Sequence, residues 1–281
     1  MEKIKFFCTS HKNIYYLEKF FPEITMIGLN SNLLASKLWH DSSKKINLSE
    51  KFFCYADLIG HYYVWKNLLP ECNDSLWVGF SQYRRFWLKH KIINEYPLTS
   101  LDNLLLKEPD LSWKDYDTIV AAPFIFKKKI KELFKNFFLL KFLQDFDSIK
   151  YYTTVQKQLE DSLGSSGREI ITDTIKMLPD YDRIGFKDFL NNRNYLSAHG
   201  MYISKKKIIN SYSEVLFSWL EKCENIINKN NNLPLLKNQR IFQYINERFL
   251  DYWMCRNVRT LRWPIAMYNE EKSIITQIGK I

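Results

Sequence analysis

The stretch YADLIGHYYVWKNLLPECNDSLWVGFSQYRRFW, residues 55–87, decides the fold that this sequence predicts. Its first half places apolar side chains at helical spacing, and residues 76–80 read as a buried strand after a short turn. A helix followed by such a strand is typical of an open α/β sheet, in which ligands bind beyond the carboxyl ends of the strands. We expect the strand to stop at Ser81, and the positions beyond its end are Gln82, Tyr83, Arg84 and Arg85.

The two adjacent arginines fit an anion site. A guanidinium group is planar, stays charged and can give two parallel hydrogen bonds to phosphate oxygens. An arginine pair on a surface loop is the plain alternative. The preceding strand with Gly79 and the flanking aromatic residues favour a phosphate ligand over that alternative.

Strand and helix patterns alternate over residues 1–123. Strands are predicted at 3–10, 23–28 and 117–123, and a helix is predicted at 11–21. Such alternation is typical of a parallel sheet with helices packed on it. We therefore expect residues 1–123 to form a parallel-sheet, nucleotide-binding α/β half of the protein.

The pattern becomes mostly helical over residues 124–281. We expect this half to complete the ligand site within the same compact unit. The elements predicted here are helices within 124–178 with a flexible loop at 164–167, a strand over 194–203, helices at 206–227 and 239–255, and an irregular tail.

The composition is that of a compact globular protein. Of 281 residues, 46% are hydrophobic and 16% aromatic, with 8 Gly and 8 Pro, which excludes a disordered chain. The five cysteines are odd in number and lack metal-ligand spacing, so reduced thiols in the cytoplasm are expected. The amino-terminal segment lacks the pattern of a signal peptide, and no apolar run reaches the ~18 residues of a membrane span. We expect a cytoplasmic protein.

The net charge of +10 favours polyanionic partners, whether nucleic acid, anionic lipid or a nucleotide-activated substrate. The lysines are not interleaved with aromatic residues, and no nucleic-acid recognition motif is present, so nucleic acid is not expected as a partner. Residues 124–143 place a Phe and Leu stripe at helical spacing among lysines. This segment reads either as a helix at an anionic membrane surface or as a domain helix with solvated lysines.

Three segments of the chain resemble a known family. They are WKN at 65–67 followed by the strand and QYRR, the opening IKFFCTSHK at 4–12, and Arg240 with ERFL at 247–250. Together they are similar to a bacterial family of capsular and surface-polysaccharide glycosyltransferases, long filed as a domain of unknown function. Gln82 stands where that family usually has His, and residues 200–202 read Gly-Met-Tyr in place of Asn-Met-Phe.

The resemblance implies a fold and an activity. The fold is a GT-A-like nucleotide-diphospho-sugar transferase fold with added helical segments. The activity is transfer of a sugar from a nucleotide-diphosphate donor, expected to be UDP-linked, to a growing capsular or surface polysaccharide. The acceptor would be a glycan or a lipid-linked glycan at the inner face of the cell membrane. A non-catalytic basic protein that binds membranes or nucleic acid is the alternative.

Many sugar transferases neutralise the leaving diphosphate with a divalent metal held by Asp-x-Asp at a strand end. The triplets here, Asp115/Asp117, Asp145/Asp147 and Asp180/Asp182, fall before a strand, at a helix end and in a loop, where caps and turns are the better interpretation. We therefore expect no metal and no other cofactor. The arginines, with Lys12, would stabilise the diphosphate, and direct displacement with inversion needs only one further base.

The expected site combines these positions. For catalysis it holds Glu247, His199, Arg84 and Arg85; for donor binding it holds Thr9, Ser10, His11, Lys12, Gln82, Tyr83, Gly200, Arg240 and Arg248. Glu247 lies seven residues after Arg240 on one helix face, so it is either the acceptor base or half of a buried Arg-Glu pair. Each histidine also has a structural interpretation, and Asp57 and Glu50 are weaker candidates.

Overall fold

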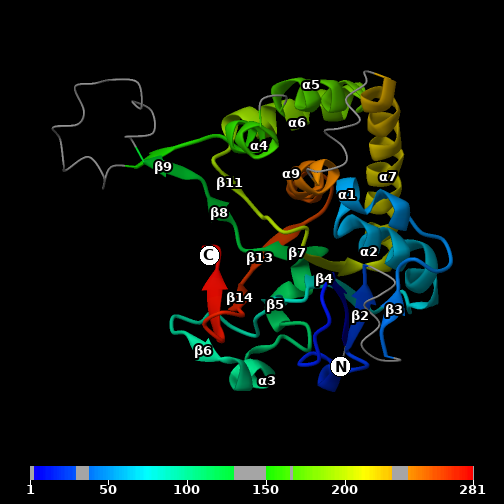
Figure 1. The fold of residues 1–281 in the computed structure, drawn as a ribbon. Helices are drawn as coiled ribbons and strands as arrows, with labels where there is room; N and C mark the ends of the chain where they lie inside the picture. Colours follow the sequence, from blue (N-terminus) through cyan, green and yellow to red (C-terminus); the bar gives the residue numbers. More distant parts are fainter. Residues whose placement is uncertain (1–2, 30–37, 130–149, 165–166, 230–239, 281) are drawn as a thin grey trace.

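The computed structural model describes residues 3–29, 38–129, 150–164, 167–229 and 240–280. Within these ranges the protein is a mixed α/β structure built on one large sheet, with helices α4, α5, α6, α7 and α9 gathered on one side of it (Figure 1). The α/β fold class is confirmed. The predicted division at residue 123 remains a prediction, and strands from both sides of it share this sheet.

The sheet strands lie in the order β13-β7-β12-β4-β5-β14-β15-β6, and β1, β2 and β3 extend from β4 in that order. Their bounds are β1 Ile4–Ser10, β2 Ile24–Gly28, β3 His40–Asp41, β4 Trp77–Gln82, β5 Arg85–Trp87, β6 Tyr96–Pro97, β7 Thr118–Ala121, β12 Tyr202–Lys205, β13 Thr260–Trp263, β14 Ile265–Asn269 and β15 Ile274–Ile278. The shorter strands β8 Phe124–Ile125, β9 Lys127–Lys129, β10 Lys150–Tyr152 and β11 Tyr195–Leu196 form two separate ribbons.

The helices lie at α1 Phe52–Tyr55, α2 Leu58–Tyr63, α3 Leu101–Leu104, α4 Val155–Leu163, α5 Gly167–Lys176, α6 Asp180–Asn192, α7 Lys206–Lys229 and α9 Ile241–Asn257. The predicted helices at 206–227 and 239–255 are thus confirmed as α7 and α9. None of the described helices is both long enough and apolar enough to cross a membrane.

Alternation along the strands divides the interior into two cores. On β1, Phe7 packs with the helices, whereas Phe6 and Cys8 face the other core, which contains α3 and the last strands. Because successive strand side chains point to opposite faces, a strand covered on both faces reads as a continuous apolar run. That is why IKFFC was recognisable in the sequence as a buried strand.

The sheet is parallel only in part. Strand β1 pairs parallel with β2 and β4, and β2 pairs parallel with β3, so this section of the sheet is parallel as predicted. Strand β12 pairs antiparallel with both β4 and β7, so it separates the two parallel sections. The irregular tail expected after residue 255 is wrong, because this segment forms strands of the sheet. Strand β13 pairs parallel with β7, and β14 pairs antiparallel with β5 and β15.

Two predicted helices are also corrected. Residues 11–21 contain only a 3-10 turn, Glu18–Phe20, because Ser10 Oγ bonds locally to Lys12 and the buried residues at 14, 17 and 20 repeat every three positions. The start of the lysine-rich segment is extended, since 124–125 and 127–129 form β8 and β9. The rest of its predicted membrane or domain helix, 130–143, lies outside the described residues, as does 165–166 of the predicted loop.

Candidate functional site

The candidate site lies where β1 and β4 end. These strands run parallel with Thr9 opposite Gln82, so their carboxyl ends meet. Strand β12 runs antiparallel to β4, and its amino end therefore brings the preceding residues, His199 and Gly200, to the same edge. This edge of a parallel section is where open α/β sheets bind ligands.

The QYRR segment forms a hairpin rather than an open loop. Strand β4 continues through Gln82, one residue past the predicted end, and Gln82 pairs with Arg85 across a two-residue turn. The backbone N–H of Tyr83 donates to the Thr9 carbonyl at 2.9 Å, and the Arg84 carbonyl accepts from Tyr268 N–H at 2.8 Å. Both arginines therefore stand on a backbone held from two sides.

A small cavity opens at this hairpin. Its volume is about 80 Å³, which is room for a phosphate-sized group and not for a whole nucleotide. The described residues that line it are His11, Leu29, Phe52, Ala56, Asp57, Gln82, Tyr83, Arg84, Arg85 and Arg240. Three guanidinium groups face one carboxylate among these lining residues, so the cavity has a positive local charge suited to an anion.

Asp57 is the buried acid of the cavity. Gln82 Nε2 donates to Asp57 Oδ2 at 2.7 Å, and Thr9 Oγ1 donates to Asp57 Oδ1 at 3.4 Å. Burial raises the pKa of Asp57, while the nearby His11, Arg85 and Arg240 oppose that rise. The preceding residue, Ala56, has a φ of 46°, a strained value that is uncommon outside glycine and that is found at functional sites.

The loop before β12 holds His199 in a left-handed conformation. His199 and Gly200 have φ values of 74° and 62°. The His199 N–H donates to the Glu247 carboxylate, and the His199 carbonyl accepts from Gln82 Nε2 at 3.0 Å. A Cβ on Gly200 would lie 3.3 Å from Gln243 Nε2, so both backbone angle and packing favour glycine here. The predicted strand at 194–203 is thus two strands separated by this loop.

Both site histidines are neutral at pH 7. Burial, helped by Arg85, Arg248 and Arg84, lowers the pKa of His199 to about 3. Burial also lowers the pKa of His11, although Asp57 opposes the shift. This low pKa argues against His199 as a proton acceptor near neutral pH, because a cation would be both desolvated and repelled there. Neutral imidazoles at these positions can still hydrogen-bond a ligand.

Glu247 is paired with Arg248 and not with Arg240. Arg248 Nη1 lies 3.0 Å from Glu247 Oε2, and the Arg248 guanidinium also donates to Gln158 of α4. Arg240 lies just before α9 with a φ of 49°, is exposed, and lines the cavity with Asp57. The predicted Arg240–Glu247 pair fails because the helix starts after Arg240, so the two residues do not share a helix face.

Burial raises the pKa of Glu247, and Arg248 and Arg85 oppose that rise. Burial lowers the pKa of Arg85, helped by Arg84 and opposed by Asp57 and Glu247. These charged groups therefore lie close enough to interact. The structure thus brings together the expected catalytic set of Glu247, His199, Arg84 and Arg85.

The other expected donor-binding residues divide into two groups. His11 lines the cavity and packs edge-on against Tyr83 at 5.1 Å. Thr9 and Ser10 are buried. The Thr9 hydroxyl bonds to Asp57, the Ser10 hydroxyl bonds locally to Lys12, and the Lys12 ammonium lies 2.8 Å from Glu270 Oε2. These three do not line the cavity. The weaker candidate Glu50 is exposed and does not line it either.

The Asp-x-Asp triplets lie away from this cavity where they are described. Asp117 pairs with Arg259 at 3.0 Å, while Asp182 is buried and accepts from Tyr252 Oη at 3.0 Å. The third triplet, 145/147, lies outside the described residues. In the described part of the chain, no group of three or more His, Cys, Asp and Glu side chains lies close enough to hold a metal ion.

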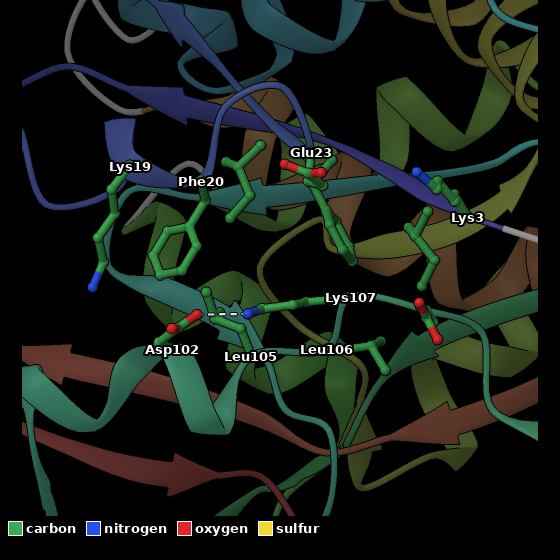
Figure 2. Close-up of a pocket in the computed structure, with 12 residues that line it drawn as sticks. Lys3, Lys19, Phe20, Glu23, Asp102, Leu105, Leu106 and Lys107 are labelled. Carbon is green, nitrogen blue, oxygen red and sulfur yellow. Dashed lines mark hydrogen bonds and ion pairs between the residues drawn. The ribbon is translucent and has the colours of Figure 1, made fainter.

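A larger cavity, of about 370 Å³, lies at the amino ends of β1 and β2. Figure 2 shows its lining, in which Lys107 pairs with Asp102 at 2.5 Å near the Phe20 ring. Acidic and basic side chains alternate around its apolar floor, and the predicted site residues do not line it. Parallel strands present their ligands at the opposite end, so the smaller cavity is the better candidate.

Sequence reasoning underrated Asp57 and missed Gln243, Asn246 and Gln158. Asp57 is the one acid within the apolar run YADLIGHYYVW, and that charge in a buried segment was the available signal. Gln243 and Asn246 face Gly200 from α9, and Asn246 Oδ1 accepts from Tyr212 Oη at 2.6 Å. These contacts join segments far apart in the chain, so local patterns do not reveal them.

The fold is similar to that of a solved glycosyltransferase. The chain superposes on the solved apo structure of the WbbM bifunctional glycosyltransferase with a TM-score of 0.62 and 17% identity, covering 94% of this chain and 45% of that one. The chain therefore spans less than half the length of that protein, and the similarity at this identity concerns the fold alone. No curated protein matches the chain.

The chain belongs to the family described as Domain of unknown function (DUF4422), which matches residues 5–258. The sequence resemblance pointed to a family filed as a domain of unknown function, and this match confirms that family, whereas capsular-polysaccharide glycosyl transfer stays a prediction. The match covers both the QYRR hairpin and the segment from Glu247 to Arg248, so the whole candidate site lies within the family's domain.

Proposed function

We propose that the protein is a glycosyltransferase that moves a sugar from a nucleotide-diphosphate donor, UDP-linked, to a capsular or surface-polysaccharide acceptor. The observation that carries this proposal is the phosphate-sized cavity at the carboxyl ends of β1 and β4, with Arg84, Arg85 and Arg240 in its lining. The glycosyltransferase fold supports the same class of reaction.

The arginines would bind and stabilise the leaving diphosphate. Negative charge develops on that group as the glycosidic bond to the donor breaks, and fixed positive charges in a partly dry site stabilise it strongly. The backbone of the QYRR hairpin is held from both sides, so the guanidinium groups are oriented before the donor binds. Turnover without a metal ion follows from this assignment.

Glu247 is the better candidate than His199 for the base that accepts the acceptor's hydroxyl proton. Burial raises its pKa, which moves a carboxylate toward the range where a general base works near neutral pH. His199, with a pKa of about 3, would serve as a neutral hydrogen-bonding group. A single base and a stabilised leaving group suit direct displacement with inversion of the sugar.

The nucleoside and the sugar would extend outward from the small cavity, past His11 and Tyr83. The acceptor, a glycan or a lipid-linked glycan, would approach from the Glu247 side. The proposed location is the inner face of the cell membrane, to which residues 124–143 would contribute through their lysines.

A ligand screen tests the proposal. Thermal unfolding is measured with UDP-, GDP-, CMP- and dTDP-sugars, since a ligand at 100 times its dissociation constant stabilises by about 2.7 kcal/mol. A rise in melting temperature with UDP-sugars supports the proposal. Binding to single-stranded RNA at moderate salt without any response to nucleotide sugars would favour the nucleic-acid-binding alternative instead.

A further inference from the structure

The side chain of Gln82 makes three hydrogen bonds inside the site, two as a donor and one as an acceptor. Its Nε2 donates to Asp57 Oδ2 at 2.7 Å and to the His199 carbonyl at 3.0 Å, and its Oε1 accepts from Arg85 Nη1. Only 5% of the residue is exposed. The orientation of the amide is therefore determined, because a flipped amide would place oxygen against two acceptors and nitrogen against a guanidinium group.

Gln82 thus lies between the Asp57 carboxylate and the Arg85 guanidinium group, which would otherwise attract one another. A guanidinium group next to a buried carboxylate normally forms a bidentate ion pair with it. Here Arg85 reaches Asp57 only through the Gln82 amide, and Arg85 Nη1 alone is used in doing so. The Gln82 amide thus links the two charged groups without a direct ion pair between them, which leaves Nε and Nη2 of Arg85 outside this contact.

If that amide were removed, the surroundings would favour a direct ion pair between Arg85 and Asp57. Arg84 carries a like charge beside Arg85, and Arg85 Nε is buried without a hydrogen-bond partner. Asp57 cannot readily turn away, because the strained Ala56 backbone and the Thr9 hydroxyl hold it at the cavity. Arg85 would then gain most by pairing directly with Asp57, which would occupy the fork.

We infer that Gln82 is a positioning residue that keeps the Arg85 guanidinium group apart from Asp57 and open to an incoming diphosphate. This inference rests on the proposed function, since it assigns the diphosphate as the ligand of Arg85. Gln82 also fixes the His199 carbonyl, so the same amide ties the β4–β5 hairpin to the loop that presents His199.

The test is rescue by a second substitution, with UDP as the probe and calorimetry as the measurement. Gln82→Met keeps the side-chain volume but removes all three hydrogen bonds, and it should weaken UDP binding about tenfold. Adding Asp57→Asn to that variant removes the carboxylate that captures Arg85, and UDP affinity should return to within about threefold of the wild type. A purely structural role for Gln82 predicts a further loss in the double variant, because two buried contacts are then damaged.

Two controls separate the possible failures. Gln277→Met removes a similar amide on β15, where Gln277 Oε1 accepts from Ile92 N–H at 2.8 Å outside the cavity, and it should leave UDP affinity unchanged. If Gln82→Met does not fold, Gln82→Leu removes the same three hydrogen bonds with a smaller apolar side chain, and Asp57→Asn should rescue UDP binding on the same logic. Absence of UDP binding by the wild type would overturn the proposed function, whereas UDP binding without rescue would overturn this inference alone.

Discussion

Arg248 Nη1 lies 3.0 Å from Glu247 Oε2, and both side chains are almost completely withdrawn from solvent. The same guanidinium group bonds to Gln158, so this neighbouring pair on α9 also fastens α4 to the site. A buried pair of this kind costs desolvation to form, but removing one partner leaves the other charge unpaired in the interior. The pair therefore has consequences for stability that an exposed pair lacks.

We predict that Arg248→Met lowers the free energy of unfolding by about 3–5 kcal/mol, because Glu247 then stays buried without its partner. The matched control is Arg259→Met, which removes an arginine paired with Asp117 at the surface at 3.0 Å and should cost at most about 1 kcal/mol. Urea unfolding followed by fluorescence measures both. Equal losses in the two variants would contradict a buried, structurally important pair.

The roles of Glu247 and His199 should separate in turnover. Glu247→Gln keeps acceptors for the Arg248 and His199 hydrogen bonds but removes the base, so the turnover rate should fall by about 10²–10⁴-fold with folding intact. His199→Gln removes a group that is already neutral at pH 7 and should cost about tenfold or less. A larger loss for His199→Gln than for Glu247→Gln, measured with a UDP-sugar donor, would reverse the assignment.

His61 should make the fold acid-sensitive. It is buried, stacks on Phe80 with ring centroids 4.4 Å apart, and burial lowers its pKa from 6.5 to about 3. Between those pH values the unfolded chain binds a proton that the folded chain does not, so the stabilisation is complete above pH 6.5 and is lost as the pH falls.

Relative to His61→Phe, the wild type should therefore lose about 1.4 kcal/mol of unfolding free energy per pH unit below 6.5. Urea unfolding of both proteins at pH 7 and pH 5 gives the difference, in which the other titrating groups cancel. If the two proteins lose stability in parallel, the low pKa of His61 is refuted.

Peripheral membrane binding is predicted from the lysine-rich segment, whose residues 130–149 lie outside the described structure. The wild type should float with vesicles rich in phosphatidylserine. Changing Lys127, Lys128, Lys129 and Lys131 to Gln should release it, because each lost lysine weakens the free energy of membrane binding by about 1 kcal/mol. The control carries the same charge change at Lys187, Lys207, Lys222 and Lys272. A wild type that does not float at physiological salt removes the membrane claim and leaves the transferase proposal standing.

Local patterns were enough to predict the elements that decide the fold. Apolar runs of the right period predicted strands β1, β2, β4 and β7 and helices α7 and α9. The end of β4, which comes just before Arg84 and Arg85, was predicted to within one residue. The family resemblance extended this to the fold type, and the comparisons agree with it.

The remainder depended on contacts between distant segments. Strand β13 is only partly buried and Pro264 separates it from β14. The pairing of these strands with β7 and β5 joins segments far apart in the sequence, so it had no local signal. Asp57 bonds to Gln82, 25 positions away, and burial gives His199 its low pKa, helped by arginines on other elements. Sequence spacing does not show desolvation, and desolvation is what distinguishes these groups from ordinary surface residues.

The central claim is that Arg84 and Arg85 bind the diphosphate in place of a metal ion, and UDP calorimetry in the presence of EDTA tests it most directly. The account predicts that the wild type binds UDP with the chelator present. Arg84→Lys and Arg85→Lys keep the charge but lose the bidentate fork, and each should weaken binding about tenfold while the melting temperature without ligand stays the same. UDP binding that disappears with EDTA and returns with manganese or magnesium, or that is unchanged in both lysine variants, would contradict the account.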